Sequence, residues 1–288
     1  MRALYDVPAP AKLNLFLHIT GQRSDGYHLL QSVFMLIDWC DTLHFEHRAG
    51  GAITREDLGA PLPPDDLITR AARALQHASS CREGAHIAVH KRIPAQAGMG
   101  GGSSDAASTL LALNRLWGLG LARRELAAIG LKLGADVPFF LAGQHAWVQG
   151  IGEQIELITL PVAHFLVAKP PQGIDTATIF RDKLLQRANK PATILGFAAD
   201  PYGFGHNDLQ PVAQRLCPQV AEGIGWLAQL GLHGRMTGSG SAVFAPVLQA
   251  KVLETFGHAL PAAPADWQVR LCSNLERHPL AGWLPGDN

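Results

Sequence analysis

The sequence predicts an α+β fold, in which runs of strands and runs of helices follow one another without regular alternation. The first 50 residues carry strand patterns, whereas residues 65–133 carry mainly helix patterns. The length of 288 residues corresponds to about two domains at roughly 150 residues each. We expect the division to lie between residues 1–160 and 161–288. Apolar residues make up 47% of the chain, which is enough to form a core and argues against intrinsic disorder.

The first part of the chain predicts three strands and a turn. Residues 12–20 alternate between leucine or isoleucine and other residues, the period of a strand with one buried face. The Ser-Asp-Gly sequence at 24–26 has the composition of a turn. Residues 33–37 and 42–46 predict two more strands, which we expect to be separated by the polar residues 38–41.

Helices dominate the following segment. Asp65 is a candidate N-cap for a helix over 67–78, where apolar residues recur on one stripe. Residues 86–89 predict a short strand. A second amphipathic helix is expected over 106–117 and a third over 123–133.

The second half shows weaker patterns. Residues 165–168 predict a strand, and residues 175–187 predict a helix capped by Asp175 or Thr176. Two helices fit within 208–230. Residues 236–246 predict two strands joined by a glycine-serine turn.

Composition excludes several classes of protein as first hypotheses. The chain has 24 Lys and Arg against 24 Asp and Glu, and this balance argues against nucleic acid and anionic membranes as partners. The sequence contains no stretch of about 18 strongly apolar residues, so we expect no transmembrane helix. The four cysteines lack C-x-x-C spacing, which is typical of reduced thiols in a cytoplasmic protein. The oligomeric state stays open between a monomer and a weak dimer.

A glycine-rich loop over 94–104 is the most informative segment. Four of the five residues 98–102 are glycine, and the loop leads directly into a predicted helix. Glycines let the backbone approach a bulky anion, and a helix N-terminus offers free N–H groups. Ser103 and Ser104 add hydroxyl donors. The arrangement suits a polyphosphate.

Three other kinds of loop fit these residues less well. A flexible linker rarely runs into a well-formed amphipathic helix. A P-loop requires a lysine after its last glycine, and no lysine lies between Arg92 and Arg115. A dinucleotide-binding loop requires a third glycine where this chain has Ser103.

Four segments together resemble the GHMP kinases. The loop with its continuation through Ala107 resembles the nucleotide-binding motif of that superfamily. Within the superfamily, three consecutive glycines followed by Ser-Ser-Asp-Ala-Ala are similar to the motif of the 4-diphosphocytidyl-2-C-methylerythritol kinases. The other matching segments, in the order of the family, are residues 10–17 with 23–28, residues 134–139, and residues 236–244.

The resemblance implies a fold and an activity. It implies a GHMP kinase two-domain fold, with an N-terminal domain like the second domain of ribosomal protein S5 and an α/β C-terminal domain. The implied reaction transfers phosphate from ATP to the 2-hydroxyl of 4-diphosphocytidyl-2-C-methylerythritol, a step of isoprenoid precursor synthesis. The implied partners are therefore ATP, Mg²⁺ and a small molecule with a cytidine diphosphate group.

The resemblance also implies the catalytic and nucleotide-binding residues. Asp136 is the implied general base, with Lys12 beside it to keep the carboxylate ionised; from composition alone, each could equally be an ordinary solvated charge. Ser104 is a possible contact of Mg²⁺, whose ligands are otherwise unknown. The implied ATP-binding residues share the glycine-rich loop: Pro94, Gly98, Met99, Gly100, Gly101, Gly102, Ser103 and Ser104.

The implied substrate-binding residues come from several segments. Tyr27 and Phe180 would sandwich the cytosine, and His28 would read its edge; Phe180 could instead be a core residue of its helix. Asn14 and Thr178 are implied contacts of the erythritol or diphosphate part. A second glycine-serine turn, for which a plain hairpin turn is the alternative, adds Gly238, Ser239 and Gly240.

Three rival functions remain at this point. Another GHMP kinase, such as a homoserine or mevalonate kinase, would have no use for an aromatic base clamp at 25–28. A dinucleotide-dependent oxidoreductase is disfavoured by Ser103 in the position of the third glycine. A non-catalytic nucleotide-binding module would be expected to have lost Lys12 or Asp136, and both are present.

Overall fold

Two β-sheets organise the chain. The structure, a computed structural model, describes residues 1–284. The larger sheet has the order β3-β4-β2-β5-β6, with β1 pairing antiparallel to β2. Its strands are β1 (Ala3–Gln22), β2 (His28–Arg48), β3 (Ile53–Asp57), β4 (Gly84–His90), β5 (Ala146–Gln149) and β6 (Gln154–Leu157). The smaller sheet has the order β10-β7-β9-β8, built from β7 (His164–Lys169), β8 (Arg235–Met236), β9 (Val243–Val247) and β10 (Gln268–Ser273).

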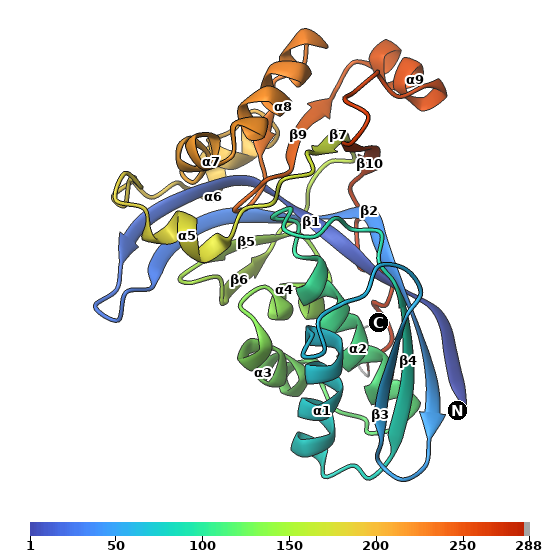
Figure 1. Cartoon of the computed structure of the whole chain (residues 1–288). Coiled ribbons are helices and arrows are strands. Elements are labelled where there is room, and N and C mark those ends of the chain that lie inside the picture. The colour runs from blue at the N-terminus through green and yellow to red at the C-terminus, as the bar shows by residue number, and fades with distance from the viewer. Residues whose placement is uncertain (285–288) are drawn as a thin grey trace.

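Helices fill the remaining layers. Figure 1 shows β1 and β2 crossing the middle of the molecule, with α1–α4 below them and α7, α8 and α9 above. The first group is α1 (Leu67–Ser79), α2 (Gly101–Leu116), α3 (Arg123–Leu133) and α4 (Val137–Ala142). The other helices are α5 (Thr176–Arg181), α6 (Ile194–Ala198), α7 (Gln210–Leu216), α8 (Pro218–Gln229) and α9 (Ala250–His258). The mixed architecture confirms the predicted α+β class.

The predicted break at residues 38–41 is wrong, because β2 is one continuous strand of 21 residues. Asp41 is fully buried, but its carboxylate is satisfied. It accepts hydrogen bonds from the backbone amides of Arg92 (2.5 Å) and Ile93 (2.8 Å) and pairs with the ammonium of Lys91. A polar residue inside a strand is tolerated when its buried charge finds such partners.

Three predicted helix boundaries are also corrected. The N-cap of α1 is Asp66 and not Asp65, since the Asp66 carboxylate accepts from the amide of Thr69 at 3.0 Å. Helix α2 begins at Gly101 and not at residue 106, so the last glycines of the loop are already helical. Helix α5 keeps its predicted cap, Asp175, but ends at Arg181.

The two halves contribute to a common hydrophobic cluster. Apolar residues of β1 and β2, such as Leu13 and Met35, pack in the same cluster as Phe165 and Phe244 of the smaller sheet. The end of the chain returns to the first half: the amide of His278 donates to the carbonyl of Gly143 at 2.8 Å. The domain division at residue 160 therefore stays a prediction.

Within the described residues, no helix is both long and apolar enough to span a bilayer. All four cysteines have free thiols.

Two buried histidines predict a loss of stability in acid. Burial lowers the pKa of His145 to about 4 and that of His278 to about 3. Both values lie below the ordinary value of about 6.5 that the unfolded chain would show. Between the folded and the unfolded pKa, the unfolded chain binds more protons than the folded chain. The stability that depends on these two neutral histidines is therefore fully present above about pH 6.5 and is lost as the pH falls toward 4. We expect the free energy of unfolding to fall by about 1.4 kcal/mol per pH unit for each histidine in this window.

Urea denaturation at several pH values measures this slope. His145→Asn should flatten it, because the asparagine oxygen can replace Nδ1 as acceptor for the Leu36 amide (3.2 Å) and does not titrate. His90→Asn, at an exposed position, is the control and should leave the slope unchanged. If His145→Asn left the slope unchanged, His145 would not be a source of the acid sensitivity.

Candidate active site

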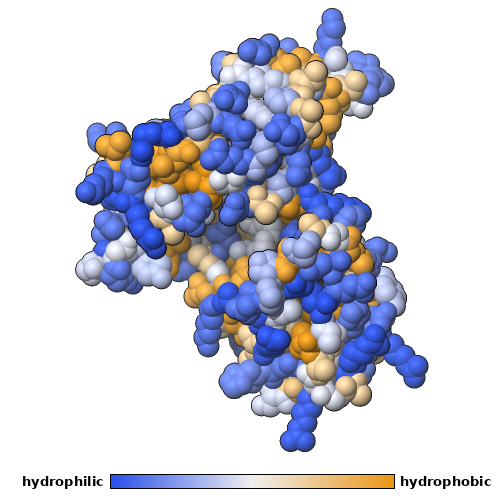
Figure 2. Space-filling model, viewed as in Figure 1, coloured by the Kyte–Doolittle hydropathy of each residue, from blue (hydrophilic) through white to orange (hydrophobic). Residues whose placement is uncertain are grey.

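A cleft of about 670 Å³ lies where the two sheets meet. Figure 2 shows the molecule hollowed between its upper and lower parts. Its lining includes the glycine-rich loop with the start of α2, the turn at 238–240, and Phe180 of α5. Lys12 and Asn14 of β1 form part of the lining, together with Asp136. The cleft thus collects residues that are far apart in the sequence.

The glycine-rich loop is fixed by the N-terminus of α2. Gly100 is the N-cap and has φ 71°, a left-handed conformation that favours glycine. Helix geometry leaves the amides of Gly101, Gly102 and Ser103 without partners inside the helix, and all three residues line the cleft. Free amides at a helix N-terminus bind phosphate. The loop therefore has the geometry that a polyphosphate requires.

The two glycine turns are bonded to each other. The amides of Ser241 and Ala242 donate to the carbonyls of Gln96 (3.1 Å) and Ala97 (3.3 Å). Gly98 has φ 71°, and a Cβ atom there would lie 2.2 Å from the carbonyl oxygen of Thr237. The turn at 238–240 is therefore more than a hairpin turn, because it supports the glycine-rich loop and lines the cleft.

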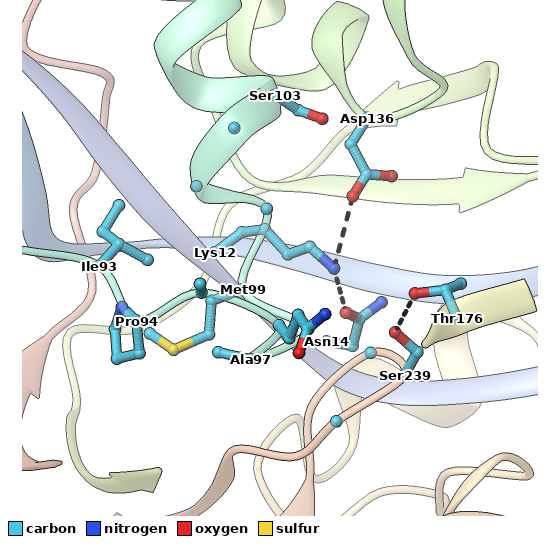
Figure 3. Close-up of a pocket in the computed structure, with 18 of the residues that line it drawn as sticks. Lys12, Asn14, Ile93, Pro94, Ala97, Met99, Ser103, Asp136, Thr176 and Ser239 are labelled. Atoms are coloured by element: carbon cyan, nitrogen blue, oxygen red, sulfur yellow. Dashed lines mark hydrogen bonds and ion pairs between the residues drawn. The ribbon is translucent and has the colours of Figure 1, made fainter. Parts of the chain in front are cut away.

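Lys12 and Asp136 form an ion pair at the centre of the cleft (Figure 3). The Nζ atom of Lys12 lies 3.7 Å from Oδ2 of Asp136, and the two side chains are 5% and 29% exposed. Burial lowers the pKa of the Lys12 ammonium, and the charge of Asp136 opposes this shift. Asp136 stands at the N-cap position of α4, but its side chain makes no capping hydrogen bond. Its carboxylate is thus available to the cleft.

Asn14 links this pair to the second turn. Its Oδ1 accepts from the Lys12 ammonium, and its Nδ2 donates to the hydroxyl of Ser32 at 2.8 Å. Its backbone amide donates to the hydroxyl of Thr237 at 2.9 Å. The orientation of Lys12 is therefore set from two sides, by Asn14 and by Asp136.

Four predicted site residues do not line the cleft. Tyr27 is 58% exposed, and His28 packs its ring on Phe180 at 5.2 Å between centroids. The hydroxyl of Thr178 donates to the capping carboxylate of Asp175 at 2.7 Å. Ser104 is fully buried, and its hydroxyl has no partner in the part of the chain that the structure describes. The other predicted residues do line the cleft.

Sequence reasoning missed a buried charge cluster beside the loop. Lys91 pairs with both Asp41 and Asp105, and burial raises the pKa of the Asp105 carboxyl while Lys91 opposes the shift. Asp41 in turn holds the two amides that precede the loop. No sequence signal joined these residues, because they come from three separate elements. Asp105 does belong to the loop motif, but the motif gave it no role.

Comparison with known proteins identifies the family. The model of the GHMP kinases N terminal domain matches residues 66–144, and that of the GHMP kinases C terminal domain matches residues 188–265. The chain belongs to the GHMP kinases. A 4-diphosphocytidyl-2-C-methyl-D-erythritol kinase from Delftia acidovorans is 64% identical over the full length of both chains. The enzyme of that name from Albidiferax ferrireducens is 62% identical, covering 100% of this chain and 98% of its own.

Solved structures agree with this membership in the GHMP kinases. A crystal structure of 4-(cytidine 5'-diphospho)-2C-methyl-D-erythritol kinase superposes with a TM-score of 0.80 at 33% identity, covering 93% of this chain and 98% of that chain. A homoserine kinase from Cytophaga hutchinsonii reaches a TM-score of 0.71 at 15% identity, covering 96% of each chain, and shows the shared fold alone. GHMP kinases use ATP as the phosphate donor. The family confirms the predicted kinase and leaves no place for the oxidoreductase alternative.

Proposed function

We propose that this GHMP kinase transfers the γ-phosphoryl group of ATP to the 2-hydroxyl of 4-diphosphocytidyl-2-C-methyl-D-erythritol in the cleft described above. The observation that carries the proposal is the Lys12–Asp136 ion pair. Both residues line the same cleft as the glycine-rich loop and Phe180. Full-length relatives above 60% identity bear the name of this kinase. The substrate is therefore a small molecule, in keeping with the zero net charge. Location in the cytoplasm stays a prediction.

The phosphate end of the reaction lies at the start of α2. The amides of Gly101–Ser103 would hold the β- and γ-phosphates. The residues present fit a Mg²⁺ ion that arrives with ATP, because the Ser103 side chain lines the cleft at the start of α2, and Mg²⁺ keeps several waters and needs few protein ligands. When bound, Mg²⁺ neutralises charge on the β- and γ-phosphates. Ser103 replaces the buried Ser104 as our candidate ligand.

Asp136 is the proposed general base. As the substrate oxygen forms a bond to the γ-phosphorus, the bond from that phosphorus to the bridging oxygen of ADP breaks, and the hydroxyl proton passes to Asp136. The Lys12 ammonium lies 3.7 Å from this carboxylate and orients it by the ion pair. Being 5% exposed, the same ammonium can also stabilise charge on the transferring phosphoryl group.

The part of the cleft lined by Phe180 is the proposed site of the cytosine. Phe180 lines the cleft and offers an aromatic face on which a base can stack. His28 lies against this ring. Tyr27 is 58% exposed, and its contact with the base stays a prediction. Asn14 faces the middle of the cleft, where the erythritol chain would run.

A coupled ADP-release assay tests the substrate. The purified chain is given ATP and Mg²⁺ with 4-diphosphocytidyl-2-C-methyl-D-erythritol, mevalonate or homoserine in parallel. We expect turnover with the cytidine substrate alone, because only that substrate can use an aromatic base site. Turnover confined to mevalonate or homoserine would overturn the proposal.

A further inference from the structure

Arg187 lies outside all the sequence motifs described above. It nevertheless contacts both His28 and Phe180, at the proposed cytosine site. Its Nε–H donates to Nε2 of His28 at 3.0 Å. Its NH2 group donates to the carbonyls of Asp182 (2.7 Å) and Phe180 (3.3 Å), and its NH1 group to that of Leu185 (3.0 Å). Four hydrogen bonds thus hold one guanidinium between His28 and the turn that follows α5.

The contact with Arg187 sets the tautomer of His28. A guanidinium is always protonated in proteins and can only donate, so Nε2 of His28 must accept. Burial lowers the pKa of His28, and the charge of Arg187 lowers it further, which keeps the imidazole neutral. A neutral imidazole carries one proton, which is therefore on Nδ1. Among the described residues, no hydrogen bond of Nδ1 is found. His28 does not itself line the cleft but packs on Phe180, which does, and we place this free donor at the edge of a base stacked there.

A fixed donor can distinguish cytosine from uracil. Cytosine has an acceptor at N3, whereas uracil has an N–H donor there. An Nδ1–H group facing that edge can bind cytosine, but it meets another donor in uracil. A site built around one hydrogen bond rejects the analogue that cannot make it.

We propose that Arg187 is a specificity-determining positioning residue, which fixes His28 as an Nδ1–H donor and so makes the enzyme select a cytidine over a uridine diphosphate substrate. This inference rests on the proposed function, because it requires the cytosine to bind against Phe180. Arg187 itself touches neither the phosphates nor the reacting hydroxyl. It acts through His28, while its bonds to three carbonyls hold its own position.

The test compares the cytidine substrate with its uridine analogue. We expect kcat/KM of the natural protein to favour the cytidine substrate by about tenfold or more, the scale of one good hydrogen bond. In Arg187→Met this ratio should approach one, mainly through a higher KM for the cytidine substrate, with kcat nearly unchanged. Arg187→Lys, which can still donate to Nε2, should restore part of the preference.

Arg215→Met is the matched control. Arg215 pairs with Asp182 of the same turn but makes no contact with His28, so this variant loosens the turn and should keep the cytidine preference. Equal loss of preference in both variants would overturn the proposal, as would a preference retained in Arg187→Met.

Nitrogen-15 NMR of the histidines gives a readout that does not depend on the folding of a variant. In the natural protein, His28 should show a protonated Nδ1 and a bare Nε2; the opposite tautomer would overturn the proposal. The proposed function fails separately, because that failure would appear as no ADP release from the natural protein with the cytidine substrate.

Discussion

Asp136→Asn should lower kcat by about 10²- to 10⁴-fold, the usual contribution of a general base. The asparagine keeps the shape of the side chain but cannot accept the hydroxyl proton. Affinity for ATP should stay similar, because the proposed phosphate contacts are the amides at the start of α2, and this carboxylate is not among them. The Asp136 side chain makes no capping bond to α4, but its charge compensates the buried Lys12 ammonium, so the melting temperature should fall as well. ADP release measures kcat, and a nucleotide titration measures the Kd for ATP.

Asp6→Asn is the control for the carboxylate change. The side chain of Asp6 is 86% exposed and lies outside the cleft, so this variant should keep full kcat. Near-normal turnover in Asp136→Asn would contradict the base assignment and would leave Lys12 as the main electrostatic contribution of the pair.

Gly98→Ala should weaken ATP binding and lower stability together. A Cβ atom at this position would lie 2.2 Å from the carbonyl oxygen of Thr237 and 2.8 Å from the amide nitrogen of Gly240. Both contacts are backbone atoms, which cannot swing aside, so the loop must shift. Because a displacement of about 1 Å can reduce activity by about 10²-fold, we expect KM for ATP to rise at least about tenfold. Initial rates at varied ATP and a thermal melt measure the two effects.

Gly120→Ala separates the clash from the backbone conformation. Gly120 has φ 65° but nothing lies within 4 Å of a Cβ atom there, and it is outside the cleft. This variant should lose about 1 kcal/mol of stability with unchanged KM for ATP. If Gly98→Ala matched it in both KM and melting temperature, close contact between the two glycine turns would have no part in nucleotide binding.

Local patterns predicted the elements that fold by local rules. The strand in 12–20 and the helix in 67–78 follow from the spacing of their apolar residues, and the structure confirms both. The predicted break at 38–41 was wrong because the partners of Asp41 are distant in the sequence. Asp41 stays in a buried strand because Lys91 and two amides, some 50 residues away in sequence, satisfy its charge, and no local pattern contains them.

By itself, the sequence determined the kinase family and the α+β class, and its motifs predicted a phosphate-binding loop and the site residues Lys12 and Asp136, because a motif consists of residue types at fixed short spacings. Only the tertiary structure decided which groups meet. It brought the turn at 238–240 against Gly98, removed Ser104 from the cleft, and joined Arg187 to His28 across 159 residues. A hydrogen bond of 3 Å depends on where two strands or turns come to lie, and that placement is set by the packing of the whole core.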